Sequence, residues 1–188
     1  DAMESRGLGD VYKRQDWLGF KQRKEESKQR GLLRGRGVSN YLEVTAPVET
    51  EMGGIRFEDN GAVTIITGTL DYGQGHAVAF AQVLHSFLGI PFERIKLLQG
   101  DSDELITGGG TGGSKSIMAS GGAIIEAATE VIKKAKTVAS YFFETSEEDI
   151  EFKNGNLTVA GTDKSVSLIE LSSELKTNFT KPDGYQTL

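Results

Sequence analysis

Apolar residues along the chain follow two periods, which predict strands and helices in a definite order. Residues 55–58 and 62–70 predict two strands, the second of them rich in β-branched side chains, and Asn60-Gly61 between them is typical of a tight hairpin. Residues 77–88 carry apolar side chains at helical spacing, which predicts an amphipathic helix. We expect its buried stripe to consist of Val78, Ala81, Leu84, Phe87 and Leu88.

A strand follows this helix, and then a much longer helix. Gly89 is expected to cap the helix and residues 94–99 to form a strand, which completes a βαβ-like unit. Residues 115–143 predict a long helix, in which Gly121 and Gly122 are expected to pack closely against a neighbouring backbone. Its buried face is expected to comprise Ile124, Ala128, Val131, Ile132, Ala135, Val138, Ala139 and Phe142.

The remaining patterns complete an α+β fold with a mixed sheet and packed helices. Residues 17–30 predict a polar helix, and residues 151–159 predict a second Asn-Gly hairpin. Residues 166–176 predict a short helix that begins with a capping box, in which Ser167 is the N-cap and Glu170 lies three residues later.

The chain divides into three parts. Residues 1–15 have no sustained period and resemble the translated adapter sequence found at the ends of metagenomic gene fragments, so we set them aside as a non-native leader. Residues 16–176 are expected to form part of one domain, and residues 177–188 are expected to be a truncated loop. On this interpretation the chain is a piece of a longer protein.

Composition narrows the possible functions. The 188 residues include no cysteine, which excludes disulfides and thiolate metal sites within the chain, and with only two histidines no metal site is expected. No apolar run is long enough to span a membrane. The net charge of −6 argues against general nucleic-acid binding. The basic run at residues 21–36 is interpreted as a solvated helix face or as a contact with a partner subunit.

Two glycine-rich segments stand out, each between a strand-like run and a helix-like run. We call residues 71–76 the first glycine loop and residues 108–116 the second glycine loop. Helices begin with unpaired backbone N–H groups, and a loop with little side chain lets an anion approach them. Two such loops predict a ligand with more than one anionic group, such as a phosphate-bearing cofactor.

Familiar motifs do not explain these loops. The segment 73–75 lacks the third glycine of a dinucleotide fingerprint, and Ser114 interrupts the Gly-Lys-Ser order of a phosphate-binding P-loop. The acidic run 101–104 lacks the later ligand and glycine of a calcium loop, so its carboxylates are expected to be turn and capping groups. His76 is either a general base or, as we favour, a residue at the helix start that bonds to backbone or ligand.

Three segments in order carry a family resemblance. Residues 69–82, 99–103 and 108–122 resemble the second molybdopterin-binding domain of the xanthine dehydrogenase/aldehyde oxidase family, and are most similar to bacterial large subunits of the carbon monoxide dehydrogenase type. The resemblance covers roughly residues 17–175. It implies a fragment of a cytoplasmic molybdenum hydroxylase, an oxidoreductase that hydroxylates an aldehyde, an N-heterocycle or a similar small molecule with water-derived oxygen.

The resemblance also implies the cofactor and the residues that contact it. The cofactor would be molybdopterin with molybdenum held by its own sulfurs, in the cytosine dinucleotide form. FAD and iron–sulfur clusters would lie on partner subunits or domains, beside the remainder of the large subunit. The implied cofactor-binding residues are Gly73, Gln74, Gly75, His76, Thr111, Gly112, Gly113, Ser114, Lys115 and Ser116.

Alternatives remain open at this point. Gln74 could instead brace its loop, and Ser114 could be a plain N-cap. Ala77-Val78 stand where relatives carry Glu-Thr, and the Gly-x-Gly-Glu-like segment that holds the family's catalytic glutamate does not occur in this sequence, so no catalytic residue is assigned. A binding or scaffold module with structural glycine loops and a stand-alone nucleotide-binding enzyme are the competing hypotheses.

Overall fold

The computed structural model describes residues 16–37, 50–176 and 180–188. The chain divides into two units, residues 1–42 and 43–188, and we describe each by itself. The expected leader at residues 1–15 and part of the expected extended segment before residue 50 lie outside the described residues. Within the described part, no helix is long and apolar enough to cross a membrane.

The described part of the first unit is a polar helix followed by an extended segment. Helix α2 (Phe20–Gln29) ends before Gly31, whose φ of +72° turns the chain back. The guanidinium of Arg36 lies 4.0 Å from the ring centroid of Trp17. Most of the basic residues on α2 are exposed, which both a solvated helix face and a contact with a partner subunit require.

The second unit begins with a three-stranded sheet in the order β1–β2–β3. Strand β1 (Gly53–Phe57) pairs antiparallel with β2 (Val63–Thr67), and β2 pairs parallel with β3 (Ile95–Leu98). The Asn-Gly hairpin and the βαβ-like unit are therefore both confirmed. A 3₁₀ turn, η1 (Phe92–Arg94), leads into β3.

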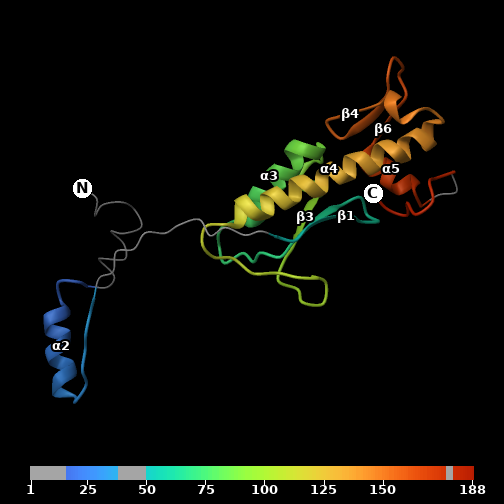
Figure 1. The fold of residues 1–188 in the computed structure, drawn as a ribbon. Coiled ribbons are helices and arrows are strands. Elements are labelled where there is room, and N and C mark those ends of the chain that lie inside the picture. Colours follow the sequence, from blue (N-terminus) through green and yellow to red (C-terminus); the bar gives the residue numbers. More distant parts are fainter. Residues whose placement is uncertain (1–15, 38–49, 177–179) are drawn as a thin grey trace. The chain divides into compact units, whose positions relative to one another are not determined.

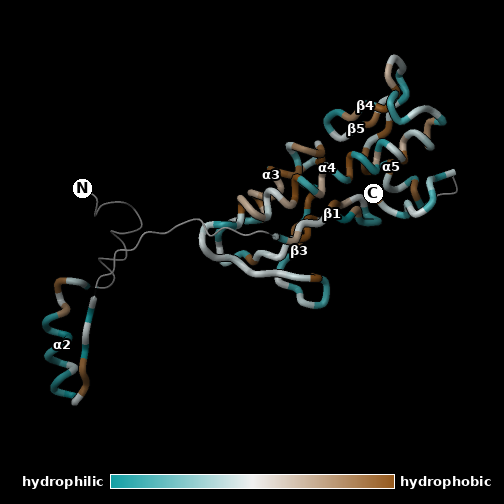
Figure 2. The backbone as a smooth tube through the Cα atoms, in the orientation of Figure 1, coloured by the Kyte–Doolittle hydropathy of each residue, from teal (hydrophilic) through white to brown (hydrophobic). Residues whose placement is uncertain are grey.

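Two helices cover one face of this sheet. Helix α3 (His76–Leu88) and helix α4 (Ser116–Phe143) lie side by side against it (Figure 1). Figure 2 shows apolar stretches where these helices meet the strands. The side chains of Ile65, Leu84 and Ile124 at this junction are completely buried, so burial of apolar surface holds the layers together.

The buried stripe of α3 differs from the expected one. Val78 is 64% exposed and Phe87 is 41% exposed, whereas Phe80, which the stripe omitted, is completely buried. Ala81, Leu84 and Leu88 are buried as expected. Residues spaced by four lie in a row along a helix, and the row that begins at His76 is the one that faces the sheet and α4.

The close backbone contact of α4 involves a different glycine from the expected pair. A Cβ atom at Gly122 would meet nothing within 4 Å, and one at Gly121 would meet only the side chain of Ile117. A Cβ atom at Gly53 of β1 would instead lie 2.6 Å from the backbone carbon of Ala123. The expectation for Gly121 and Gly122 is therefore wrong, and the glycine that lets strand and helix approach belongs to the strand.

A second small sheet packs against the later part of α4. The 3₁₀ turn η2 (Glu147–Asp149) leads into β4 (Ile150–Lys153), which forms the expected hairpin with β5 (Asn156–Val159). Strand β6 (Ser165–Ser167), which the sequence pattern did not reveal, pairs with β5.

Helix α5 (Leu168–Glu174) follows β6 directly. The predicted capping box is present, because the side chain of Ser167 accepts from the amide of Glu170 and the carboxylate of Glu170 accepts from the amide of Ser167. The described fold is α+β, with a mixed sheet and an antiparallel sheet joined through α4.

Candidate functional site

The first glycine loop is folded around the side chain of Asp71. Its Oδ1 atom accepts hydrogen bonds from the amides of Gly73 and Gln74 at 2.7 Å and of Gly75 at 3.3 Å. Its Oδ2 atom accepts one from the amide of His76 at 2.8 Å. These bonds, that from Gly73 first, hold the pKa of the Asp71 carboxyl below its ordinary value.

This arrangement corrects one sequence-based expectation. We expected the amides of the first glycine loop to be open to an external anion, but a carboxylate of the chain itself already accepts from them. Gly75, the N-cap of α3, has a φ of +77° and supplies no side-chain cap, so Asp71 takes over the capping role. An aspartate just before a turn commonly bonds to the amides that follow, and this signal could have identified it.

Gln74 keeps one polar group available. Its Oε1 atom accepts from the amide of Tyr72, so the side chain does brace its loop. Among the described residues, no acceptor faces its Nε2 group, and the side chain is exposed. The NH₂ group of Gln74 can therefore donate to a ligand.

The second glycine loop rests directly on the end of β2. A Cβ atom at Gly108 would lie 2.7 Å from the carbonyl oxygen of Gly68, and that same oxygen accepts from the amide of Gly110 at 3.1 Å. The hydroxyl of Thr111 accepts from the amide of Leu70 at 3.2 Å. Glycine at position 108 is thus required by contact between two backbones.

The start of α4 keeps its backbone donors open. The N-cap position is held by Lys115 without a side-chain cap, so the interpretation of Ser114 as the N-cap is wrong. Ser114 instead has a φ of +54°, a conformation that few residues other than glycine adopt. Within the described part of the chain, no hydrogen bond is found from the amides of residues 112, 113, 114 and 116, while residues 113 and 114 form a turn. This helix start carries partial positive charge, so it suits an anion.

The two loops meet at one open hollow of about 570 Å³. Seven of the ten residues expected to contact the cofactor line it, and Ala79, Phe80 and Ile117 add apolar surface. The seven are Gln74, His76, Thr111, Gly112, Gly113, Ser114 and Ser116.

The other three expected residues do not line this hollow. The backbone amides of Gly73 and Gly75 face Asp71. Lys115 lines a separate hollow of about 360 Å³, together with Glu51 and Gly109.

His76 is buried, with 4% of its surface exposed, although it lines the hollow. Its ring lies against Phe80, with 4.9 Å between centroids, and its Nδ1 atom is 3.1 Å from Nε2 of Gln99. Its recorded partner is therefore a side-chain amide, where we expected backbone or ligand. Gln99 was not among the expected site residues, although it begins the segment 99–103 that carries part of the family resemblance.

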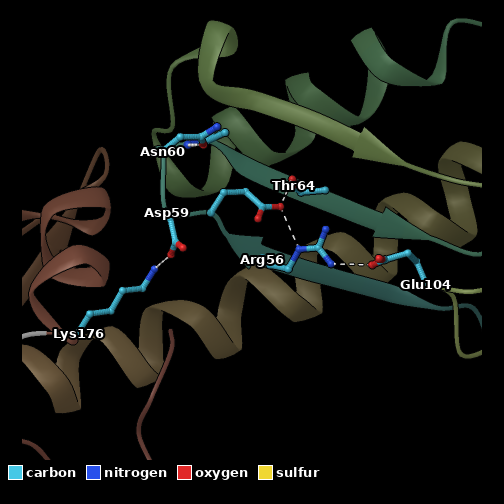
Figure 3. A network of polar contacts seen from close by, with 8 residues as sticks. Arg56, Asp59, Asn60, Thr64, Glu104 and Lys176 are labelled. Carbon is cyan, nitrogen blue, oxygen red and sulfur yellow. Dashed lines mark hydrogen bonds and ion pairs between the residues drawn. The ribbon is translucent and has the colours of Figure 1, made fainter.

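The acidic run 101–104 forms a turn, as expected. The carboxylate of Asp101 accepts from the amide of Asp103 at 2.9 Å, and Glu104 forms an ion pair with Arg56 of β1 at 3.0 Å (Figure 3). Hydrogen bonds from Thr64 and then Arg56 hold the pKa of Glu58 below its ordinary value. No group of three or more histidine, aspartate or glutamate residues in the described segments could hold a metal ion.

Comparison with known proteins gives the family. A model of the molybdopterin cofactor-binding domain matches residues 10–185, which is nearly the whole chain. The chain belongs to this family. Membership favours the cofactor-binding hypothesis over a scaffold module or a stand-alone nucleotide-binding enzyme.

Individual relatives agree with this assignment. The nicotine 6-hydroxylase large subunit of Paenarthrobacter nicotinovorans is 31% identical over 185 residues, covering 91% of this chain and 23% of that protein. The carbon monoxide dehydrogenase large chain of Hydrogenophaga pseudoflava is 33% identical over 129 residues, covering 69% of this chain and 16% of that protein.

Solved structures show the same fold. Reconstituted CO dehydrogenase from Oligotropha carboxidovorans superposes with a TM-score of 0.65 at 27% identity, over 89% of this chain and 23% of that one. This molybdopterin-binding domain thus spans less than a quarter of the length of the relatives named here. The resemblance found in the sequence is confirmed, as is the α+β fold.

Proposed function

We propose that the hollow between the two glycine loops binds the molybdenum cofactor, with the phosphates at the start of α4. The observation that carries this proposal is the meeting of seven expected contact residues at one hollow, beside a helix start whose amides are open. A hollow of about 570 Å³ lies in the usual range for cofactor and small-molecule sites.

The residues present fit the cofactor by their chemistry. The amides of Gly112, Gly113 and Ser114 are donors suited to phosphate oxygens. The hydroxyl of Ser116 lies 3.2 Å from that of Thr111, and it can donate to a phosphate when it accepts from Thr111. The NH₂ group of Gln74 suits an acceptor on the pterin. Gly73, Gly75 and Lys115 act indirectly in this proposal, because they shape the loops without lining the hollow. The bound molybdenum would supply the redox chemistry, and this chain would bind and orient the group that holds it.

The wider proposals follow from family membership and resemblance. The cofactor is the cytosine dinucleotide form, and the parent protein is a cytoplasmic hydroxylase of an aldehyde, an N-heterocycle or a similar small molecule. Its partners are the rest of the large subunit and subunits that carry FAD and iron–sulfur clusters. In this proposal residues 16–176 form part of the binding domain, 1–15 are non-native and 177–188 are a truncated loop.

Cofactor content of the full-length enzyme tests the proposed site. We expect the double variant Gln74→Ala and Ser114→Ala to lose most of its molybdenum, measured by mass spectrometry, because one pterin donor is removed and the hydroxyl side chain beside the proposed phosphates is lost. The matched control is Gln82→Ala with Ser86→Ala, which makes the same changes on the exposed side of α3. Equal molybdenum content in the two double variants would reject the proposed site.

A further inference from the structure

A buried cluster of polar side chains joins four elements behind the hollow. Thr67 and Thr69 lie at and just beyond the end of β2, Gln99 follows β3, Ser120 lies in α4 and His76 begins α3. Thr67, Thr69 and Ser120 are completely buried. Because a buried polar group is costly to leave unpaired, such a cluster fixes the positions of the elements that supply it.

Gln99 is the centre of this cluster. Its Nε2 atom lies 3.1 Å from the hydroxyl oxygen of Thr67, 3.1 Å from that of Thr69 and 3.1 Å from Nδ1 of His76. The hydroxyl of Ser120 donates to Thr69 at 3.3 Å. One amide group therefore links the strand ends to the first residue of α3, where the first glycine loop ends.

The orientation of the Gln99 amide bears on which nitrogen of His76 carries the proton. A neutral imidazole has one donor nitrogen and one acceptor nitrogen, whereas an amide NH₂ group can only donate. With the amide of Gln99 oriented as in this structure, its NH₂ group faces three acceptors and has two hydrogens. We assign one of these hydrogens to Nδ1 of His76, which then accepts, so that the hydrogen of the neutral ring resides on Nε2.

His85 provides an internal contrast. Its Nδ1 atom lies 2.8 Å from the carbonyl oxygen of Ile90, which can only accept, so in His85 the hydrogen resides on Nδ1. The chain contains two histidines, and they are expected to be in opposite tautomers.

We propose that Gln99 is a positioning residue that holds His76 in its Nε2–H tautomer, so that the ring offers a neutral hydrogen-bond donor to the hollow between the glycine loops. His76 lines that hollow, its Nδ1 atom is engaged, and no hydrogen bond from a described residue is found at its Nε2 atom. The group that would receive this bond is an acceptor atom of the cofactor. This last step rests on the proposed function, whereas the tautomer itself does not.

Ring nitrogen NMR of the 188-residue chain, labelled with ¹⁵N only in histidine and free of cofactor, tests the tautomer. Under mildly alkaline conditions, we expect His76 to show a pyridine-like Nδ1 and a protonated Nε2, and His85 to show the reverse. In Gln99→Glu the carboxylate can only accept, so Nδ1 of His76 is expected to become protonated while the His85 signals stay unchanged. The matched control Gln82→Glu, at an exposed position of α3, is expected to change neither ring.

Two results would overturn the proposal: a protonated Nδ1 on a neutral His76 ring in the wild-type chain, or a Gln99→Glu spectrum identical to the wild type. If Gln99→Glu loses its dispersed amide spectrum, Gln99→Leu replaces it as the test variant. That change removes the donor without adding charge, and the preference for Nε2–H is expected to be lost; a retained preference would equally overturn the role of Gln99. Because no cofactor is present, this outcome is independent of the molybdenum measurement, which tests the proposed function separately.

Discussion

Replacing Gly108 by alanine should push the second glycine loop off the end of β2. The added Cβ atom would lie 2.7 Å from the carbonyl oxygen of Gly68 and 3.1 Å from its Cα atom. Both atoms belong to the backbone of a strand end, so neither can rotate away as a flexible side chain would. The loop must move, and the hydrogen bond from the amide of Gly110 to the same oxygen is then lost.

The expected loss of stability comes from two terms. Inserting a methyl group where backbones already touch costs about 1–3 kcal/mol. Losing one backbone hydrogen bond adds about 1 kcal/mol, so the free energy of unfolding should fall by about 2–4 kcal/mol. In a chain of this size, each kcal/mol of lost stability lowers the melting temperature by about 2–4 °C, so the expected loss lowers it by roughly 9 °C.

Gly112→Ala is the matched control in the same loop. A Cβ atom at Gly112 would meet nothing within 4 Å, and Gly112 is not among the glycines with positive φ. Its stability should therefore change by less than about 0.5 kcal/mol. Gly112 lines the hollow, however, so its methyl group should hinder a phosphate and weaken binding of cytidine diphosphate about tenfold, which corresponds to roughly 1.4 kcal/mol.

Urea denaturation of the wild-type chain and both variants measures the stability difference, and a titration with cytidine diphosphate measures the binding difference. The reasoning requires Gly108→Ala to lose stability and Gly112→Ala to lose mainly affinity. Equal unfolding midpoints for the two variants would refute the argument from backbone contact.

Two further predictions concern single side chains. The pKa of Asp71 is lowered in the folded chain, so the stability that its carboxylate contributes is present at neutral pH and is lost as the pH falls through that lowered pKa. The amide NMR signals of residues 73–76 should shift together at that pH, and Asp71→Asn should abolish this transition. A common transition at the ordinary aspartate pKa of about 3.9 would contradict the prediction. Ser167→Ala removes the N-cap of α5 and should lower the free energy of unfolding, measured by urea denaturation, by about 1 kcal/mol. Ser173→Ala, at an exposed position of the same helix, should lower it by less. Equal losses in the two variants would count against the capping box.

Local signals in the sequence were sufficient for most elements. Both Asn-Gly hairpins, the C-cap at Gly89 and the capping box at Ser167 depend on a few adjacent residues, and all are present. The buried stripe of α3 was only partly right, because period alone does not tell which of two overlapping rows faces a neighbour. Packing against the sheet and α4 determines which row is buried, and in this structure Phe80 is buried and Val78 is exposed.

The part of the site that lies in the two glycine-rich motifs could be predicted from the sequence. The sequence indicated both glycine loops, and the fold brings their side chains to one hollow. The prediction missed that Asp71 occupies the amides of the first loop, although an aspartate just before a turn is a local signal for such bonds. The role of Gln99 had no local signal, because its partners lie 23 to 32 residues away along the chain.

The central claim is that the second glycine loop, rather than the first, presents open amides to the phosphates of the cofactor. Cytidine diphosphate added to the ¹⁵N-labelled chain, with cytidine as the control that lacks phosphate, tests this claim most directly. We predict that the diphosphate shifts the amide signals of Gly112, Gly113 and Ser114 most, and that cytidine does not. Largest shifts at residues 73–76, or no shifts at residues 112–114, would contradict the account.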